Sequence, residues 1–312
     1  MTTLLDPTAE VVIDGQAYVA APDFLPPNFI DSVADSLALS MAAQGIPARR
    51  ERILAMCGAF FDDPHCDELV RQMDDAGIAR SVLMLPDFSY RFPDGATGID
   101  ALIGKARAIL VRHPGRFHLW VGVDPRWGKD GIDLFERATA DGVVHGMKLY
   151  PPCGYSPSAD MLYPFYEICR RRGLPVSVHT GGSASVFQLD LGYPRLVDKA
   201  ARDFPDVNFV LSHASTCYTD EALMLCGSRP NVYLEVSGYA SQPVGRVNEL
   251  FLHDVGHKVI FGTDWPSFRA QGTQRHLLER LRGAVVGVEA LDLEEQLGHV
   301  PSSSPSLKRL PR

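Results

Sequence analysis

Long apolar runs, a positive net charge and closely spaced cysteines are all missing from this 312-residue sequence. Because no segment of about 18 consecutive apolar residues exists, we expect no membrane-spanning helix. The formal net charge of −8 repels phosphate groups, which argues against nucleic acids and anionic membranes as partners. Residues 1–15 carry acidic side chains and no basic segment, so a secretory signal is not expected.

The six cysteines include no CxxC pair, which argues against a zinc knuckle. A disulfide framework is not expected in a chain of this length without an export signal. We therefore predict reduced cysteines in a cytoplasmic protein. The hydrophobic fraction of 46% and the charged fraction of 22% are typical of a globular domain, and they exclude a mostly disordered or fibrous chain.

Eight short apolar runs, rich in β-branched residues, recur along the chain and end near Gly, Pro, Asp or His. Their hydrophobicity is nearly continuous, as parallel strands buried on both faces require. The expected strands are Val11–Val19, Arg80–Pro86, Phe117–Pro125, Val144–Pro151, Pro175–Gly181, Asn208–Ser215, Asn231–Gly238 and Lys258–Pro266.

Between these runs, apolar residues recur at three- and four-residue spacing, which predicts helices. The expected helices are Ile99–Arg112, Ile132–Ala140, Met161–Arg172, Tyr193–Phe204 and Val247–His253. Eight strand candidates with helical segments between them favour an α/β fold of the closed (β/α)8 TIM-barrel type. A doubly wound sheet would place a glycine-rich phosphate turn after its first strand, and no GxGxxG is present there.

We expect one barrel domain over residues 11–297, with an N-terminal tail at 1–10 and a disordered Ser/Pro-rich tail at 298–312. Residues 20–79 interrupt the repeat between the first two strands. This insertion would lie over the barrel mouth as a lid or a dimer contact. Its expected helices are Asp31–Gln44, Arg49–Met56 and Asp67–Ala76.

Several of the predicted strands end in ionisable residues. The catalytic and ligand-binding residues of a barrel come from those carboxyl ends. Near the ends of the fourth, fifth, sixth and eighth runs lie Lys148, His179, His213 and Asp264. Two imidazoles and a carboxylate converging on one mouth are the parts of a divalent-metal site or an acid/base site. Each histidine alone could instead bond a backbone carbonyl, and Lys148 could pair with Glu235 across the mouth.

Other polar and aromatic side chains at the predicted mouth are candidates for substrate binding. Arg126 could clamp a carboxylate through its guanidinium, although a loop arginine is more often solvated. Tyr18 could donate a hydrogen bond to a developing oxyanion. The predicted substrate-binding residues are Gln16, Tyr18, Tyr150, Arg126 and Trp265.

The motif FGTDWP at Phe261–Pro266, following PNVYLEVSG at Pro230–Gly238, resembles the amidohydrolase superfamily, specifically its amidohydrolase-related branch that includes aminocarboxymuconate-semialdehyde decarboxylase. Further similar stretches are Gln72–Leu85, His145–Pro152, Val176–Gly182 and Asp203–Ser215. The resemblance implies a distorted TIM barrel that acts as a hydrolase or a non-oxidative decarboxylase. It also implies that His179 and Asp264 are metal ligands and that His213 is catalytic or polarises the substrate.

The sequence departs from this family at its first strand. Relatives usually end that strand in Asp-x-His-x-His, whose histidines hold the metal, whereas Gln16 and Tyr18 fill those positions here. A glutamine offers only a weak neutral carbonyl ligand, and a tyrosine must lose a proton with a reference pKa of about 10. Neither replaces an imidazole for Zn²⁺. A site that holds Zn or Mn, with His213 as a further ligand, and a metal-free site both stay open.

Two enzymatic mechanisms and one non-catalytic alternative follow. With a metal, the ion would polarise the substrate and Asp264 would move a proton, in hydrolysis or decarboxylation. Without one, His179, His213 and Lys148 would supply positive potential while Asp264 acts as general base, which suits lactone hydrolysis. The expected substrate is a small carboxylate or a cyclic ester or amide. The alternative is an inactive barrel that binds a ligand or a protein partner, and the family resemblance also allows a homodimer.

Overall fold

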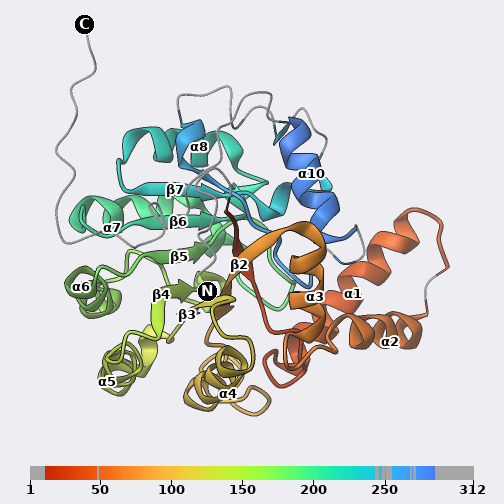
Figure 1. The fold of residues 1–312 in the computed structure, drawn as a ribbon, viewed down its shortest axis with the longest axis horizontal. Coiled ribbons are helices and arrows are strands. Elements are labelled where there is room, and N and C mark those ends of the chain that lie inside the picture. Colours follow the sequence, from red (N-terminus) through yellow and green to blue (C-terminus); the bar gives the residue numbers. More distant parts are fainter. Residues whose placement is uncertain are drawn as a thin grey trace, which may run out of the picture.

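The computed structural model describes residues 11–47, 49–242, 246–247, 250, 255–267, 269 and 272–284. Eight parallel strands follow one another in chain order around a single sheet, and helices surround them (Figure 1). Each strand overlaps one of the predicted runs. The strands are β1 (Val12–Ala17), β2 (Ile78–Leu85), β3 (Phe117–Val121), β4 (Val144–Leu149), β5 (Val176–His179), β6 (Phe209–Ser212), β7 (Val232–Glu235) and β8 (Val259–Ile260).

The sheet closes into a barrel through the residues that follow β8. Gly15 N donates to Phe261 O and Asp264 N donates to Gln16 O, each over 2.8 Å. These bonds join the first strand to the last, so the prediction of a TIM barrel is confirmed. The barrel is distorted at this seam, because β8 has only two regular residues.

The outer helices occur where the sequence predicts them, with shifted ends. The structure adds α8 and α10 to the prediction; the apolar residues 222–226 of α8 form a continuous run rather than a spaced stripe. The predicted helix Val247–His253 lies largely outside the described residues. None of the described helices is long and apolar enough to cross a membrane. The outer helices are α4 (Ile99–Arg112), α5 (Gly128–Ala138), α6 (Tyr163–Arg172), α7 (Asp198–Asp203), α8 (Thr219–Ser228) and α10 (Gln274–Ala284).

Three helices fill the predicted insertion between β1 and β2: α1 (Pro27–Ala43), α2 (Arg50–Phe60) and α3 (Asp67–Ala76). Proline at the first position of α1 is favourable, because a proline there loses no helical hydrogen bond. α1 and α2 pack together as a helical hairpin beside the barrel (Figure 1). The hairpin has a small apolar core of its own, centred on Ala34, Ile53, Cys57 and Phe61.

Alternation along each strand sorts side chains between the barrel interior and the surrounding helices. An apolar cluster inside the barrel includes Val210 and Trp120. Gly146 makes room for the Trp120 indole, since a Cβ at that glycine would lie 2.4 Å from the ring. Two residues further along their strands, Lys148 and Ser212 therefore project into the same interior as Gly146 and Val210. The strand period thus explains why polar residues gather above an apolar floor.

The close packing where β1 meets the end of β8 predicts the effect of replacing Gly15. In Gly15→Ala, the new methyl group would lie 2.7 Å from Ile260 Cγ2 and 2.8 Å from Phe261 O. Because backbone and a packed side chain must move, we expect a loss of about 1–3 kcal/mol in the free energy of unfolding, measured by urea denaturation. The matched control is Gly104→Ala at an exposed position of α4, where no atom lies within 4 Å of the added Cβ and a gain of up to about 1 kcal/mol is expected. Equal stability of the two variants would contradict this account of the seam.

Candidate active site

Lys148 is buried beneath the barrel mouth and is held by three oxygens. Its ammonium nitrogen donates to Ser212 Oγ over 2.6 Å, to Ser177 Oγ over 3.2 Å and to Gln16 Oε1 over 3.3 Å. Three acceptors match the three protons of an ammonium group. We call these three oxygens the cradle. Burial lowers the pKa of Lys148 to about 7, while nearby carboxylates oppose that shift. In the described part of the chain, no ion pair joins Lys148 to Glu235.

Gln16 connects this ammonium to the carboxylate of Asp264. Its Nε2 donates to Asp264 Oδ1 over 3.0 Å and lies 3.4 and 3.5 Å from the two ring nitrogens of His213. The orientation of the amide is fixed, because only its oxygen can accept from Lys148 and only its nitrogen can donate to Asp264. The Gln16 side chain is fully buried. The three groups therefore form one line of ammonium, amide and carboxylate.

A second hydrogen-bonded chain runs through the two histidines. His179 Nε2 lies 3.1 Å from Gly182 O, which can only accept, so the proton of His179 is on Nε2. Its Nδ1 must then accept from His213 Nε2, 3.3 Å away. His213 Nδ1 in turn accepts from the Ser237 hydroxyl, 2.9 Å away. The Ser237 hydroxyl is also the donor to Glu235 Oε2, 2.9 Å away, so its one proton is shared between two acceptors, and burial raises the pKa of Glu235 to about 8.

Burial governs the charge of the remaining ionisable groups. It raises the pKa of Asp264 to about 6, although the Gln16 hydrogen bond and the charge of Lys148 lower it in part. Burial, with a smaller effect of Lys148, lowers the pKa of His213 to about 3. It also places the pKa of His179 well below its usual value. Both imidazoles are therefore neutral near pH 7, and Asp264 titrates close to that range.

The backbone is strained at the ends of β6 and β8. His213, Ala214 and Ser215 have φ angles of 63°, 40° and 51°, and Asp264 has a φ of 54°. Residues other than glycine rarely adopt this left-handed region, at a cost of about 1–3 kcal/mol each. Such strain gathers at functional sites, where the fold holds side chains in place. It marks the two segments that carry His213 and Asp264.

An apolar cavity of about 470 Å³, part of it open to solvent, lies directly above these groups. The structure brings five predicted site residues together in its wall: Tyr18, Tyr150, His179, His213 and Asp264. Tyr150 stacks on His179, with ring centroids 4.1 Å apart. The cavity is lined by Tyr18, Leu25, Phe29, Phe61, Pro86, Phe88, Tyr150, His179, His213, Asp264, Pro266 and Ser267.

Four of the other predicted site residues are not in that lining. Lys148 and Gln16 lie beneath it, and Trp265 is fully buried outside it. Arg126 forms a two-pronged ion pair with Asp124, with nitrogen–oxygen distances of 2.8 and 2.6 Å. The guanidinium of Arg126 is thereby engaged away from the cavity.

The helical hairpin closes one side of the cavity. Leu25 and Phe29 at its start and Phe61 at its end contribute to the apolar wall. The Ser32 hydroxyl of α1 lies 3.0 Å from the Ser185 hydroxyl in the loop that follows β5. The sequence pattern places the insertion over the mouth, but it does not identify these lining residues.

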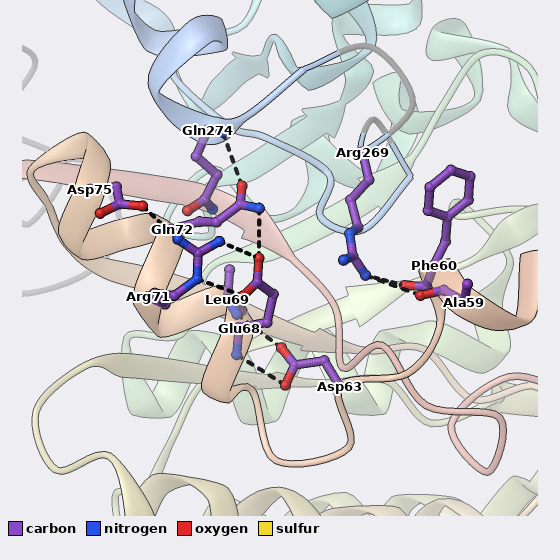
Figure 2. A network of polar contacts seen from close by, with 10 residues as sticks. All are labelled: Ala59, Phe60, Asp63, Glu68, Leu69, Arg71, Gln72, Asp75, Arg269 and Gln274. Atoms are coloured by element: carbon purple, nitrogen blue, oxygen red, sulfur yellow. Dashed lines mark hydrogen bonds and ion pairs between the residues drawn. The ribbon is translucent and has the colours of Figure 1, made fainter. Parts of the chain in front are cut away.

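Arg269, in the segment after β8, fastens the other end of the hairpin (Figure 2). It donates to Phe60 O over 2.9 Å, at the carboxyl end of α2, where a cation complements the helix dipole. In the same view, Asp63 accepts the backbone N–H groups of Glu68 and Leu69 over 3.2 and 2.9 Å, which caps the start of α3. The Arg269 contact thus ties α2 to the segment after β8, and the Asp63 contacts fix the start of α3 to the connection between the two helices.

The residues at the mouth do not fit a divalent metal. Among the described residues, no group of three or more His, Cys, Asp or Glu side chains is arranged to hold one. The oxygen of Gln16 is already bound to Lys148, and its nitrogen is not a ligand. A divalent ion about 5 Å from an ammonium would be repelled by roughly 7 kcal/mol at an effective dielectric constant of 20.

Ser177 and Ser212 are the polar residues that sequence reasoning missed. Ser177 lies two residues before His179 on β5, so the strand period puts both on the interior face. Ser212 directly precedes His213. The alternation of side chains along the strands is the sequence signal that could have identified them. Two serines at neighbouring interior positions leave room for a long side chain from β4.

The fold and the side chains at its mouth are together those of an α/β-barrel enzyme. The sequence profile of the Amidohydrolase family matches residues 50–295. The chain therefore belongs to this family, and the predicted membership of the amidohydrolase superfamily of enzymes is confirmed.

Three curated dihydroorotases match shorter segments. The enzyme of Cupriavidus taiwanensis is 33% identical over 97 residues, and that of Azoarcus sp. is 30% identical over 106 residues. These matches cover 28% and 31% of each chain. The chain thus matches less than a third of the length of these relatives.

Solved structures share the fold over nearly the whole chain. A TIM-barrel protein from Bordetella bronchiseptica has a TM-score of 0.61 at 20% identity, covering 92% of this chain and 95% of its own. A 2,6-dihydroxybenzoate decarboxylase from Rhizobium has a TM-score of 0.59 at 13% identity, covering 93% and 95%. A 5-carboxyvanillate decarboxylase from Novosphingobium aromaticivorans, complexed with manganese, has a TM-score of 0.57 at 14% identity, covering 91% and 92%. A divalent metal thus occurs within this fold.

The chain of histidines predicts defined tautomers. We expect ¹⁵N NMR to show His213 and His179 as neutral rings protonated on Nε2 at pH 7. In Ser237→Ala, the signal of His213 Nδ1 should shift because it loses its donor, while His179 keeps its tautomer. Protonation of His213 on Nδ1 would contradict the proposed direction of the chain.

The contact of Arg269 with the carboxyl end of α2 predicts a change in the local stability of the hairpin when Arg269 is replaced. Arg269→Gln removes the cation at the end of α2, a contribution of about 0.3–1 kcal/mol, so amide exchange there should accelerate roughly two- to fivefold. Hydrogen–deuterium exchange with mass spectrometry measures it. The control is Arg71→Gln, which removes exposed ion pairs to Glu68 and Asp75 and should leave α2 unchanged. The same exchange rate of α2 in Arg269→Gln and the wild type would refute the role of this contact.

Proposed function

We propose that the chain hydrolyses a small, uncharged cyclic ester or amide, with Asp264 as general base and then general acid. The observation that supports it is the position of Asp264 in the wall of an apolar cavity, hydrogen-bonded to Gln16 and with a pKa of about 6. A general base is most effective when its pKa lies near the working pH.

The reaction needs one proton to move in a cycle. The Asp264 carboxylate takes a proton from water, whose oxygen attacks the substrate carbonyl carbon. The carbonyl oxygen gains negative charge and accepts hydrogen bonds from the Tyr18 hydroxyl and from the N–H of His213, which donates to His179 in the free protein. The ring carbon–oxygen or carbon–nitrogen bond then breaks, and the leaving atom takes the proton back from Asp264.

The lining favours a neutral substrate over a carboxylate. It contains no lysine or arginine among the described residues, and burial keeps both imidazoles uncharged. Burial also raises the pKa of Tyr18 well above its usual value, so its hydroxyl stays protonated and can donate. Aromatic walls, including Phe29, Phe61 and Phe88, suit a flat ring.

Non-oxidative decarboxylation is the second candidate, because the solved structures of similar fold include two aromatic decarboxylases. This reaction would need a positively charged group to bind the substrate carboxylate. Among the predicted site residues, Lys148 beneath the cavity is the nearest such group. A bound Zn or Mn, which the sequence leaves open, would serve the same purpose, but the donor set at the mouth argues against it. An inactive, ligand-binding barrel is the remaining alternative; a cytoplasmic location and a homodimer stay predictions as well.

Asp264→Asn tests this proposal. Removing the base should lower kcat/KM for lactones or cyclic amides by about 10²–10⁴-fold. For the wild type, kcat/KM should rise with pH through about 6, because only the deprotonated carboxyl acts as base. The steady-state rate across pH 5–9 on a panel of such compounds measures both.

Asp160→Asn is the matched control, because its side chain is 93% exposed and does not line the cavity. It should keep wild-type rates. Retention of activity in Asp264→Asn, or release of CO₂ from aromatic acids with no turnover of the cyclic panel, would overturn the proposal.

A further inference from the structure

We propose that Lys148 and Gln16 together replace the metal ion in this barrel, so that the mouth takes up no stoichiometric divalent cation. The inference deepens the proposed function, since it concerns the same site. It is tested by metal binding rather than by turnover, so the two can fail separately.

The first argument is that both ends of the Gln16 amide are already engaged in hydrogen bonds. By family resemblance this position supplies a metal-binding imidazole, and here its only ligating atom, Oε1, accepts from Lys148 over 3.3 Å. The nitrogen at the other end of the amide donates to Asp264. A metal could use Gln16 only by displacing the ammonium, and turning the amide round would set its NH₂ group against that same ammonium.

The second argument is that the ammonium cannot move away. Lys148 is 1% exposed, and the cradle oxygens of Ser177 and Ser212 hold it in addition to the oxygen of Gln16. The two serine hydroxyls also lie 2.9 Å from each other, which makes the cradle continuous. When Lys148 is protonated, a positive charge therefore lies beneath the cavity, and it repels any second cation.

The third argument concerns Asp264. By resemblance it would ligate the metal, but here one of its oxygens accepts from the Gln16 amide, which Lys148 holds in turn. The protein supplies through this relay the positive potential that orients the carboxylate. Lys148 is thus a positioning residue that acts through Gln16, without reaching the cavity itself.

The test uses Zn²⁺ and Mn²⁺ as probes in calorimetric titrations of the intact protein at pH 6.5, together with elemental analysis of the protein as purified. We expect the wild type and Asp264→Asn to behave alike, with either no saturable binding or the same weak binding elsewhere. One ion per wild-type chain that is lost in Asp264→Asn would overturn the proposal. This comparison needs no change at Lys148 and stands even if variants there do not fold.

Lys148→Met tests the excluding group directly. Without the ammonium, the Gln16 oxygen becomes available and the repulsion disappears, so Zn²⁺ should bind about tenfold or more tightly than to the wild type. Lys258→Met is the control, because Lys258 is also buried but donates to the backbone oxygens of Cys226 and Arg229. It should bind as the wild type does. Equal Zn²⁺ affinity of Lys148→Met and the wild type would contradict the inference.

Discussion

A buried ammonium group is the constraint on which the barrel mouth depends. An isolated charge in such a place costs several kcal/mol, and only a full set of hydrogen bonds and nearby opposite charge offsets that cost. Lys148 obtains these from the cradle and from the carboxylates around it. Once the ammonium is fixed, the Gln16 amide can face only one way, and its nitrogen reaches Asp264. The geometry of the reactive carboxylate thus follows from a lysine that it does not touch.

Much of this arrangement can be predicted from the sequence. Continuous apolar runs indicate parallel strands, and their number indicates a closed barrel, because parallel strands with helices between them must bury both faces. Since the carboxyl ends of such strands meet at one rim, His179, His213 and Asp264 are expected together, and the structure brings them to one cavity. By resemblance to the family, the amino-acid pattern of the first strand also predicts that Gln16 and Tyr18 stand where relatives carry two ligand histidines.

The rest depends on side-chain directions that a linear pattern does not contain. Sequence cannot tell that Arg126 bonds the aspartate two residues before it, because an i, i+2 contact requires the turn that follows β3. It cannot show that the hairpin and the residues that flank it, Leu25 and Phe61, supply cavity walls, because that depends on how the two helices pack against the barrel. Gln16 could have faced solvent; only the position of Lys148 on the fourth strand decides otherwise.

The central claim is the line from ammonium through amide to carboxylate. A high-resolution crystal structure of protein soaked in Mn²⁺, with anomalous data, tests it most directly. The account predicts Gln16 Oε1 on Lys148, Gln16 Nε2 on Asp264, and no anomalous peak among residues 16, 179 and 264. A manganese peak at that position, with the glutamine turned away from the lysine, would contradict it.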